Sequence, residues 1–270
     1  VAFGLSFFLG NIFVVIFARN TNNNFIIPVL IASIIPIINF LLVFFYLPET
    51  KPNSEINKSK TALKNPLKAL FTVFKEEKIK KLSLAFFIYF IAFTGLTNIL
   101  IFFLQESLNW TTKASSGTLV VVGIIAIIVQ GGLIGPLVKK FGEMRLTLIG
   151  SGFILVACSL LITAPKENAT INIYSAVSFL AIGAGLITPT LRALISKKLD
   201  VNNQGSILSN LQGLQSLGGV LGIAMAGRVY DSFGPKSPFI AGSIILIFMI
   251  YLIAEGKNNK SIYDQKTNLF

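Results

Sequence analysis

The side chains of this sequence that could bind a ligand are mostly neutral and lie inside long apolar runs. Small and polar residues recur every three or four positions along 206–228: Ser209, Gln212, Ser216 and Gly219, with Asn210 and Gln215 beside them. This spacing places amides and hydroxyls on one face of a helix. Such a face can line a wet cavity and hydrogen-bond a polar ligand, or it can hold two membrane helices together. Both interpretations stay open for Gln212, Gln215 and Ser209.

A second polar group lies in the apolar run 82–104, where Thr94, Thr97 and Asn98 fall within two helical turns. An amide near the middle of a membrane is costly unless it meets polar partners. We therefore predict that Asn98, with Thr94 beside it, contacts a substrate. Four aromatic side chains of the same run suit either a hydrophobic ligand or lipid, and we expect lipid: Phe86, Phe87, Phe90 and Phe93.

Groups that could carry a proton or bind a metal are scarce in the apolar runs. The acidic residues lie in loops or within about one turn of the end of a run; they include Glu106, Glu143, Asp200, Asp231 and Glu255. The sequence has no histidine, and its single cysteine, Cys158, lies inside an apolar run. It thus offers neither a metal-ligand set nor a disulfide. We expect no metal, no cofactor and no enzymatic activity.

The composition that surrounds these side chains is that of a membrane protein. The 270 residues are 53% hydrophobic and 13% charged, with a mean hydropathy of +0.75. Too few charges are present to cover a soluble globule of this size. The net charge of +12 would indicate nucleic acid in a soluble protein, but here the cations cluster in short loops between apolar runs. We therefore expect the lipid bilayer, and no nucleic acid, as a partner.

The apolar runs predict an all-α membrane protein with eight transmembrane helices. About 20 largely apolar residues are needed to cross the hydrocarbon layer. The runs of this kind are approximately 1–18, 26–47, 82–104, 116–138, 146–164, 171–195, 206–228 and 237–254. They divide the chain into four parts: two helices in 1–47, a basic cytoplasmic linker at 48–81, a six-helix bundle at 82–255 and a cytoplasmic tail at 256–270. Because the first run already begins at Val1, we expect a piece of a longer protein.

The linker is the one long polar segment. Within residues 62–78 five apolar side chains recur at helical spacing, with lysines on the other faces: Leu63, Leu67, Leu70, Phe71 and Phe74. This pattern predicts an amphipathic helix that suits an anionic membrane surface. The pattern also suits a solvated tether between two helical bundles, and this is the interpretation that we favour.

The cations predict the orientation of the chain. If the linker is cytoplasmic, the same side receives three further groups: Lys139, Lys140 and Arg145; Arg192, Lys197 and Lys198; Lys257, Lys260 and Lys266. The opposite side receives far fewer. The positive-inside rule then places both ends of this chain in the cytoplasm, in a multi-pass protein of the cell membrane.

The loop 130–145 resembles the loop motif of the major facilitator superfamily. Gly135, Lys140 and Gly142 match its two glycines and a basic position, whereas Lys139 stands where the motif has an acid. Three further stretches resemble drug exporters of this superfamily: the helix exit Leu47-Pro48-Glu49-Thr50, the helix 205–230, and the stretch 3–11. In the last, Gly4 and Gly10 resemble the antiporter motif, although Asn11 replaces its proline.

The resemblance implies a conformational role for several of these residues. Gly135 and Gly142 would serve the turn of the loop, while Lys140 and Arg145 would anchor it to the inner leaflet. Gly4 and Gly10 would belong to the antiporter motif. Pro189 interrupts the run 171–195, where it frees a carbonyl and permits either a hinge or a static kink.

The resemblance also implies a fold and a function. Members have two six-helix halves, and in that numbering the present chain would cover the fifth to the twelfth helix. The implied function is transport of an amphipathic or drug-like small molecule by alternating access, as a drug-efflux-like proton antiporter in the full-length protein. Two alternatives stay open: a membrane fragment that does not transport, and half of a split carrier. The missing partner would be an N-terminal segment or a complementary chain.

Overall fold

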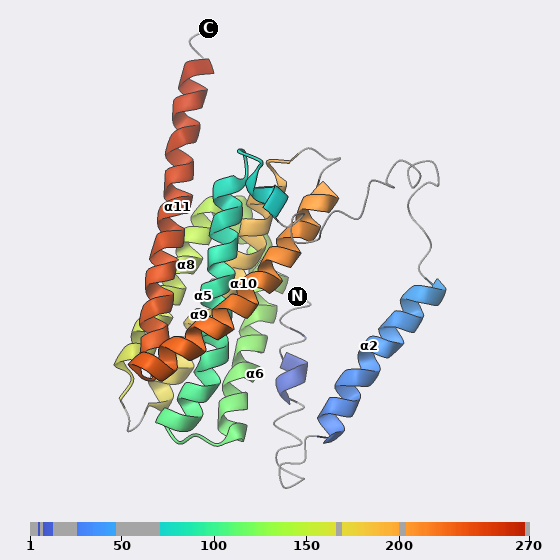
Figure 1. The fold of residues 1–270 in the computed structure, drawn as a ribbon, viewed down its shortest axis with the longest axis vertical. Coiled ribbons are helices and arrows are strands. Elements are labelled where there is room, and N and C mark those ends of the chain that lie inside the picture. Colours follow the sequence, from blue (N-terminus) through green and yellow to red (C-terminus); the bar gives the residue numbers. More distant parts are fainter. Residues whose placement is uncertain are drawn as a thin grey trace.

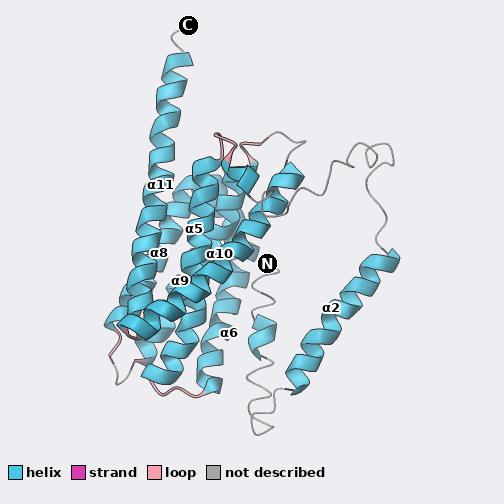
Figure 2. Cartoon of the chain, in the orientation of Figure 1, coloured by secondary structure: helices cyan, strands magenta, loops and turns pink. Residues whose placement is uncertain are grey.

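The computed structural model describes residues 5, 8–12, 26–46, 71–165, 169–199 and 204–267. Their regular structure is helical throughout, as Figure 2 shows. The α-helices are α2 (Ile26–Tyr46), α5 (Lys80–Phe102), α6 (Thr112–Ile128), α7 (Ile134–Phe141), α8 (Glu143–Thr163), α9 (Thr170–Ser196), α10 (Gln204–Phe233) and α11 (Ser237–Thr267). Three shorter segments complete the list: a 3-10 helix at Phe71–Phe74 and π-helical segments at Phe103–Ser107 and Val129–Leu133.

Each predicted span from residue 26 onward coincides with a helix or with a continuous helical rod. Six of the described helices are long and apolar enough to cross a membrane. The prediction of eight such helices is corrected at one of them: α10 is not among the six, although it has 30 residues. The glutamines, asparagines and serines of its first half make α10 more polar than α5, α6, α8 and α9. The predicted span 1–18 lies largely outside the described residues and stays a prediction.

Helices α5 to α11 form one bundle, and α2 lies apart from it in Figure 1. The most extensive helix pairs are α8 with α9 and α10 with α5, followed by α11 with α5. Figure 1 shows α10 crossing α5 obliquely and α11 continuing past the end of the bundle. The end at which α5 and α10 begin and α7 meets α8 is called here the α7–α8 end; it is the upper end in Figure 1.

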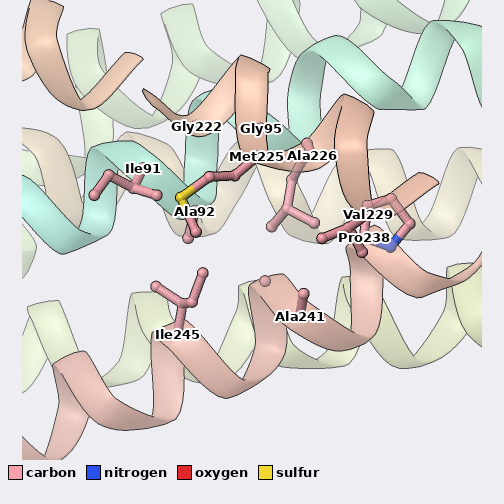
Figure 3. Close-up of a pocket in the computed structure, with 12 residues that line it drawn as sticks. Ile91, Ala92, Gly95, Gly222, Met225, Ala226, Val229, Pro238, Ala241 and Ile245 are labelled. Carbon is pink, nitrogen blue, oxygen red and sulfur yellow. The ribbon is translucent and has the colours of Figure 1, made fainter. Parts of the chain in front are cut away.

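Glycines allow the two most extensive pairs to approach closely. A Cβ on Gly150 of α8 would lie 2.9 Å from the carbonyl oxygen of Gly183 on α9. A Cβ on Gly222 of α10 would lie 2.2 Å from the carbonyl oxygen of Ile91 on α5. Gly95 of α5 lies at the same crossing, labelled in Figure 3, where a Cβ on it would lie 2.8 Å from the carbonyl oxygen of Gly222. Small residues at such crossings let membrane helices gain the van der Waals contact that holds them together in lipid.

The first described stretch of the chain also contacts the bundle. A Cβ on Gly123 of α6 would lie 2.6 Å from the backbone nitrogen of Phe8, which belongs to the helical stretch 8–12. The stretch 8–12, which belongs to the part of the chain predicted to form the end of the N-terminal bundle, therefore packs against α6.

The predicted amphipathic helix at 62–78 is only partly covered, since the linker up to residue 70 lies outside the described residues. Over 71–78 the structure has the 3-10 helix Phe71–Phe74 and turns instead of an α-helix. The reason is packing: Val73 and Ile79 are buried in the core of the bundle. The end of the linker is thereby fixed to α5 and α10.

Candidate functional site

A cavity of about 340 Å³ lies among α5, α6, α9 and α10. This volume is within the range of small-molecule pockets, roughly 300–1,000 Å³. Its lining is Phe90 and Phe93 from α5, Val122 and Ala126 from α6, Gln130 from the π-helical segment, Ala181, Ala184, Gly185, Thr188, Pro189 and Arg192 from α9, and Gln215 from α10.

Helix α9 contributes the largest share of the lining, and the spacing of its residues explains the hollow. Ala181, Ala184, Thr188 and Arg192 follow one another at three or four positions, so they share one helical face. The first two are small, and they leave space where larger side chains would fill the bundle. Pro189 lies beside this face and also lines the cavity.

Arg192 is the one charged residue among the described residues of this lining. Its Nη2 donates to Oε1 of Gln212 at 2.7 Å and to Oε1 of Gln215. Its guanidinium also lies over the ring of Phe86, 5.9 Å from the centroid, within the range of a cation–π contact. Arg192 thus joins α9 to α10 and faces the aromatic side chains of α5.

The aromatic wall of the cavity comes from α5. Phe86, Phe90 and Phe93 are at most 8% exposed, so the lipid contact expected for them is wrong. They pack on one another and on Tyr89, whose hydroxyl lies 3.2 Å from Oγ1 of Thr188. These residues point into the bundle, because α5 is surrounded by α10, α11 and α9. The rings of Phe90 and Phe93 therefore form an aromatic surface that a ligand in the cavity would contact.

The charged group of the described lining lies toward the α7–α8 end, and the amides and aromatic rings lie farther in. Arg192 lies about one turn before the end of α9, and Gln212 lies about two turns after the start of α10. Phe93 and Ala181 lie deeper, more than three turns from the same end. A molecule with one polar and one apolar end matches this arrangement.

The structure brings together two of the predicted ligand residues. Gln215 lines the cavity, and Gln212 accepts a hydrogen bond from Arg192 at its edge. Ser209 and Ser216 are exposed on the same helix, and the Ser216 hydroxyl donates to the backbone carbonyl of Gln212 at 3.2 Å. The polar stripe of α10 therefore runs from the cavity onto the outer face of the bundle.

The predicted residues of α5 lie elsewhere. Asn98 is exposed, and its amide donates to the backbone carbonyl of Thr94 at 2.9 Å. Thr94 lies beside α10, close to Gly219. Neither belongs to the lining of the cavity. Their role in substrate contact stays a prediction.

The loop 130–145 is built differently from the expectation. Gly135 lies within α7, and the turn is at Gly142, where φ is +77° and the amide donates to the Val138 carbonyl at 2.9 Å. A glycine suits this left-handed conformation because other residues are strained there. Lys140 and Arg145 are exposed on either side of the turn. The acidic position of the loop motif is occupied by Lys139. A different acid, Glu143, follows the turn directly and pairs with Lys197 at the end of α9.

The remaining predicted glycines are in the first segment. Gly4 lies outside the described residues, and Gly10 falls in the helical stretch 8–12 with open space around it. The conformational roles proposed for them and for Pro189 stay predictions.

Sequence reasoning did not single out Arg192 as a site residue, because it was counted with the cytoplasmic cations. Its position one turn inside an apolar run, in helical phase with Ala181, Ala184 and Thr188, was the available signal.

A second hollow, between α5, α10 and α11, is small and apolar, with a volume of about 40 Å³. Figure 3 shows Met225, Ala226 and Ile245 converging on it. It offers no polar group to orient a ligand, so the larger cavity is the candidate site.

The family follows from comparison with known proteins. The model of the Major Facilitator Superfamily matches residues 1–223, most of the chain. The chain belongs to the Major Facilitator Superfamily. As a member of this superfamily it is a multi-pass membrane protein of a transporter family, not an enzyme.

Superfamily members that resemble the chain are distant. The tetracycline resistance protein, class H, of Pasteurella multocida is 25% identical over 204 residues, which are 76% of this chain and 50% of that protein. Multidrug resistance protein 2 of Bacillus subtilis (strain 168) is 24% identical over 181 residues, 66% of this chain and 44% of that protein. The chain spans about half the length of the curated relatives that it matches.

A solved structure of the superfamily has the same fold. The human organic anion transporter MFSD10 (TETRAN) superposes with a TM-score of 0.60 at 20% sequence identity. The superposition covers 70% of this chain and 46% of that one. The fold assignment therefore has support from sequence and from structure.

Proposed function

We propose that this chain provides the greater part of the substrate pathway of a secondary transporter, which exports an amphipathic small molecule by alternating access. The observation that carries this proposal is the cavity among α5, α6, α9 and α10, with Arg192 toward one end and aromatic rings farther in. Membership of the superfamily and the distant resemblance to tetracycline and multidrug resistance proteins support it.

The orientation proposed on the basis of the cations gives the side of the membrane toward which Arg192 lies. The α7–α8 end carries Lys139, Lys140 and Arg145, which the positive-inside rule assigns to the cytoplasm. The end of the cavity that carries Arg192 then lies toward the cytoplasm, from which an exported substrate would enter. The coupling that we propose for the full-length protein is proton antiport. Among the described residues the cavity lining carries no carboxylate, so the proton-carrying group would lie outside this lining.

The proposal is testable with single cysteines, because Cys158 is the only native thiol and is buried. In a Cys158→Ala background, Ala184→Cys places a thiol on the cavity wall. We expect membrane-impermeant methanethiosulfonate reagents to label it in inside-out vesicles and not in spheroplasts of an expressing bacterium. Val156→Cys is the matched control: this position on α8 is 45% exposed on an apolar surface that we assign to lipid, so it should stay unlabelled.

Two exposed lysines report the orientation in the same preparations. Lys139→Cys should be labelled in inside-out vesicles, and Lys113→Cys, at the start of α6, should be labelled in spheroplasts. If Ala184→Cys reacts no faster than Val156→Cys on either side, no water-filled pathway reaches the cavity, and the proposed function is wrong.

A further inference from the structure

Arg192 carries a charge that no acid balances among the described residues. The ion pairs of this part of the chain join Lys80 with Glu77, Lys81 with Glu255 and Lys197 with Glu143. Arg192 has amide oxygens as hydrogen-bond partners instead, both bound through one nitrogen. A guanidinium has five N–H donors. Most of its hydrogen-bonding capacity and its full charge are therefore left for another group.

The Arg192 side chain is half-buried near the end of α9, so part of its charge is withdrawn from water. Buried charges are normally paired. The amides of Gln212 and Gln215 and the ring of Phe86 offset part of the cost of this desolvation through dipole and quadrupole interactions. They leave the net charge in place, next to a cavity with room for a ligand.

The lining of the cavity gives this charge a selective effect. Its described residues include Arg192 and no carboxylate, so an organic cation would be repelled by the guanidinium and would find no acid to pair with. An organic anion would gain a charge-assisted hydrogen bond, which a guanidinium forms well with carboxylate, sulfonate or phosphate. Phe90 and Phe93 lie farther in and can take an apolar body.

We propose that the cavity binds an organic anion, whose acid group meets Arg192 and whose apolar body lies on Phe90 and Phe93. This proposal rests on the function proposed above and assigns its substrate class. The acid group of an anionic lipid has the same chemistry as that of a soluble organic acid. We assign the site to the soluble acid, because the charge lies in a cavity among four helices and is held by α10.

The test uses the charge of the labelling reagent as the probe. The Ala184→Cys, Cys158→Ala chain is placed in phosphatidylcholine nanodiscs. It is then treated with a methanethiosulfonate that bears either a sulfonate or a trimethylammonium group. The labelling rate with each reagent is divided by the rate at which that reagent modifies free mercaptoethanol. We expect the ratio of the sulfonate rate to the ammonium rate to fall roughly 10-fold on Arg192→Gln, as removal of a nearby unit charge in a partly hydrated site requires. Arg192→Lys should keep most of the ratio.

The matched control is Arg228→Gln. Arg228 is an exposed cation near the other end of α10, so its removal should leave the ratio unchanged. Elution as a single peak on size exclusion checks that each variant is folded. If Arg192 serves solely to tie α9 to α10, Arg192→Gln changes both rates by the same factor, and the proposal is wrong.

Protection experiments identify the source of the anion. Naphthalene-2-sulfonate should slow labelling of Ala184→Cys at concentrations at least 10-fold lower than its neutral sulfonamide, and Arg192→Gln should abolish this difference. If phosphatidylglycerol in the nanodiscs slows labelling and the soluble sulfonate does not, the site belongs to a lipid and the proposal of a soluble substrate is overturned. A thiol at residue 184 that reacts with neither reagent contradicts the proposed function itself, whereas a reactive thiol without a preference that depends on Arg192 contradicts this inference alone.

Discussion

Single glycines set the distance between the two best-packed helices of the bundle. In lipid the hydrophobic effect does not drive helices together, so their association depends on close van der Waals contact. Gly150 meets this need on α8: a Cβ there would lie 2.8 Å from Cγ1 of Ile187 and 2.9 Å from the carbonyl oxygen of Gly183. Gly152, two residues away on the same helix, has open space around it.

We expect Gly150→Ala to destabilise the chain and Gly152→Ala to leave it unchanged or slightly more stable. The first substitution overpacks a backbone contact, which typically costs about 1–3 kcal/mol. The second adds a methyl group to an open position and lowers the flexibility of the helix. Thermal midpoints in detergent, followed by loss of the monodisperse peak on size exclusion, measure both. Equal midpoints for the two variants would contradict the close crossing of α8 and α9.

Residue types alone predicted part of the cavity. Gln212 and Gln215 stood out because amides inside an apolar run need partners, and the structure supplies Arg192 as their partner. The same argument does not distinguish Asn98, which satisfies its amide with a carbonyl of its own helix. Which polar residue faces a cavity depends on how neighbouring helices pack, and the sequence of one helix does not contain that information.

At the scale of elements, polar contacts tie the helices together at the α7–α8 end. Lys81 at the start of α5 donates to Glu255 on α11 at 2.7 Å, and Glu143 at the start of α8 pairs with Lys197 at the end of α9. The second pair also places an anion at a helix N-terminus and a cation at a C-terminus, where the helix dipoles favour them. Both pairs lie at helix ends, where water screens charges more than it does inside the bundle.

The ion pair of Glu143 with Lys197 should therefore contribute little to the free energy of unfolding, yet a coupling energy between the two side chains should be measurable. A double-mutant cycle with Glu143→Gln and Lys197→Gln should give a coupling energy of about 0.2–1 kcal/mol that shrinks as salt is added. The exposed pair of Lys80 with Glu77, at 3.6 Å, is the matched control and should give a smaller coupling. Thermal midpoints at low and high salt provide the measurement. A coupling for the first pair that is no larger than that of the control would show that this contact does not hold α8 to α9.

The helices themselves were largely predictable, because hydrophobic length determines a membrane span. Their irregularities were not. The π-helical segment at Val129–Leu133 lies inside a run that reads as a plain helix, and it carries Gln130 to the lining of the cavity. The turn of the loop is at Gly142 and not at Gly135, although both are glycines, because α7 continues through the first of them.

At the scale of the whole molecule, the described cavity is built from one bundle. Alternating access requires two bundles that move against each other around a site near the middle of the membrane. We propose that the packed helices α5 to α11 form one of them, since the chain spans about half the length of its relatives. The stretch 8–12, at Gly123 of α6, is where the described part of the first segment meets this bundle. The rest of the second bundle is the partner that we propose.

We therefore expect that the 270-residue chain binds a ligand but does not transport it alone. In proteoliposomes with an imposed pH gradient, adding naphthalene-2-sulfonate should dissipate the gradient no faster than in empty vesicles. The same preparation should still show protection of Ala184→Cys by the sulfonate, because the walls of the cavity come from α5, α6, α9 and α10. Active full-length members of the superfamily in the same vesicles provide the positive control. Proton-driven flux that exceeds the empty vesicles, and that disappears on Arg192→Gln, would show that these helices suffice for transport and that no partner is needed.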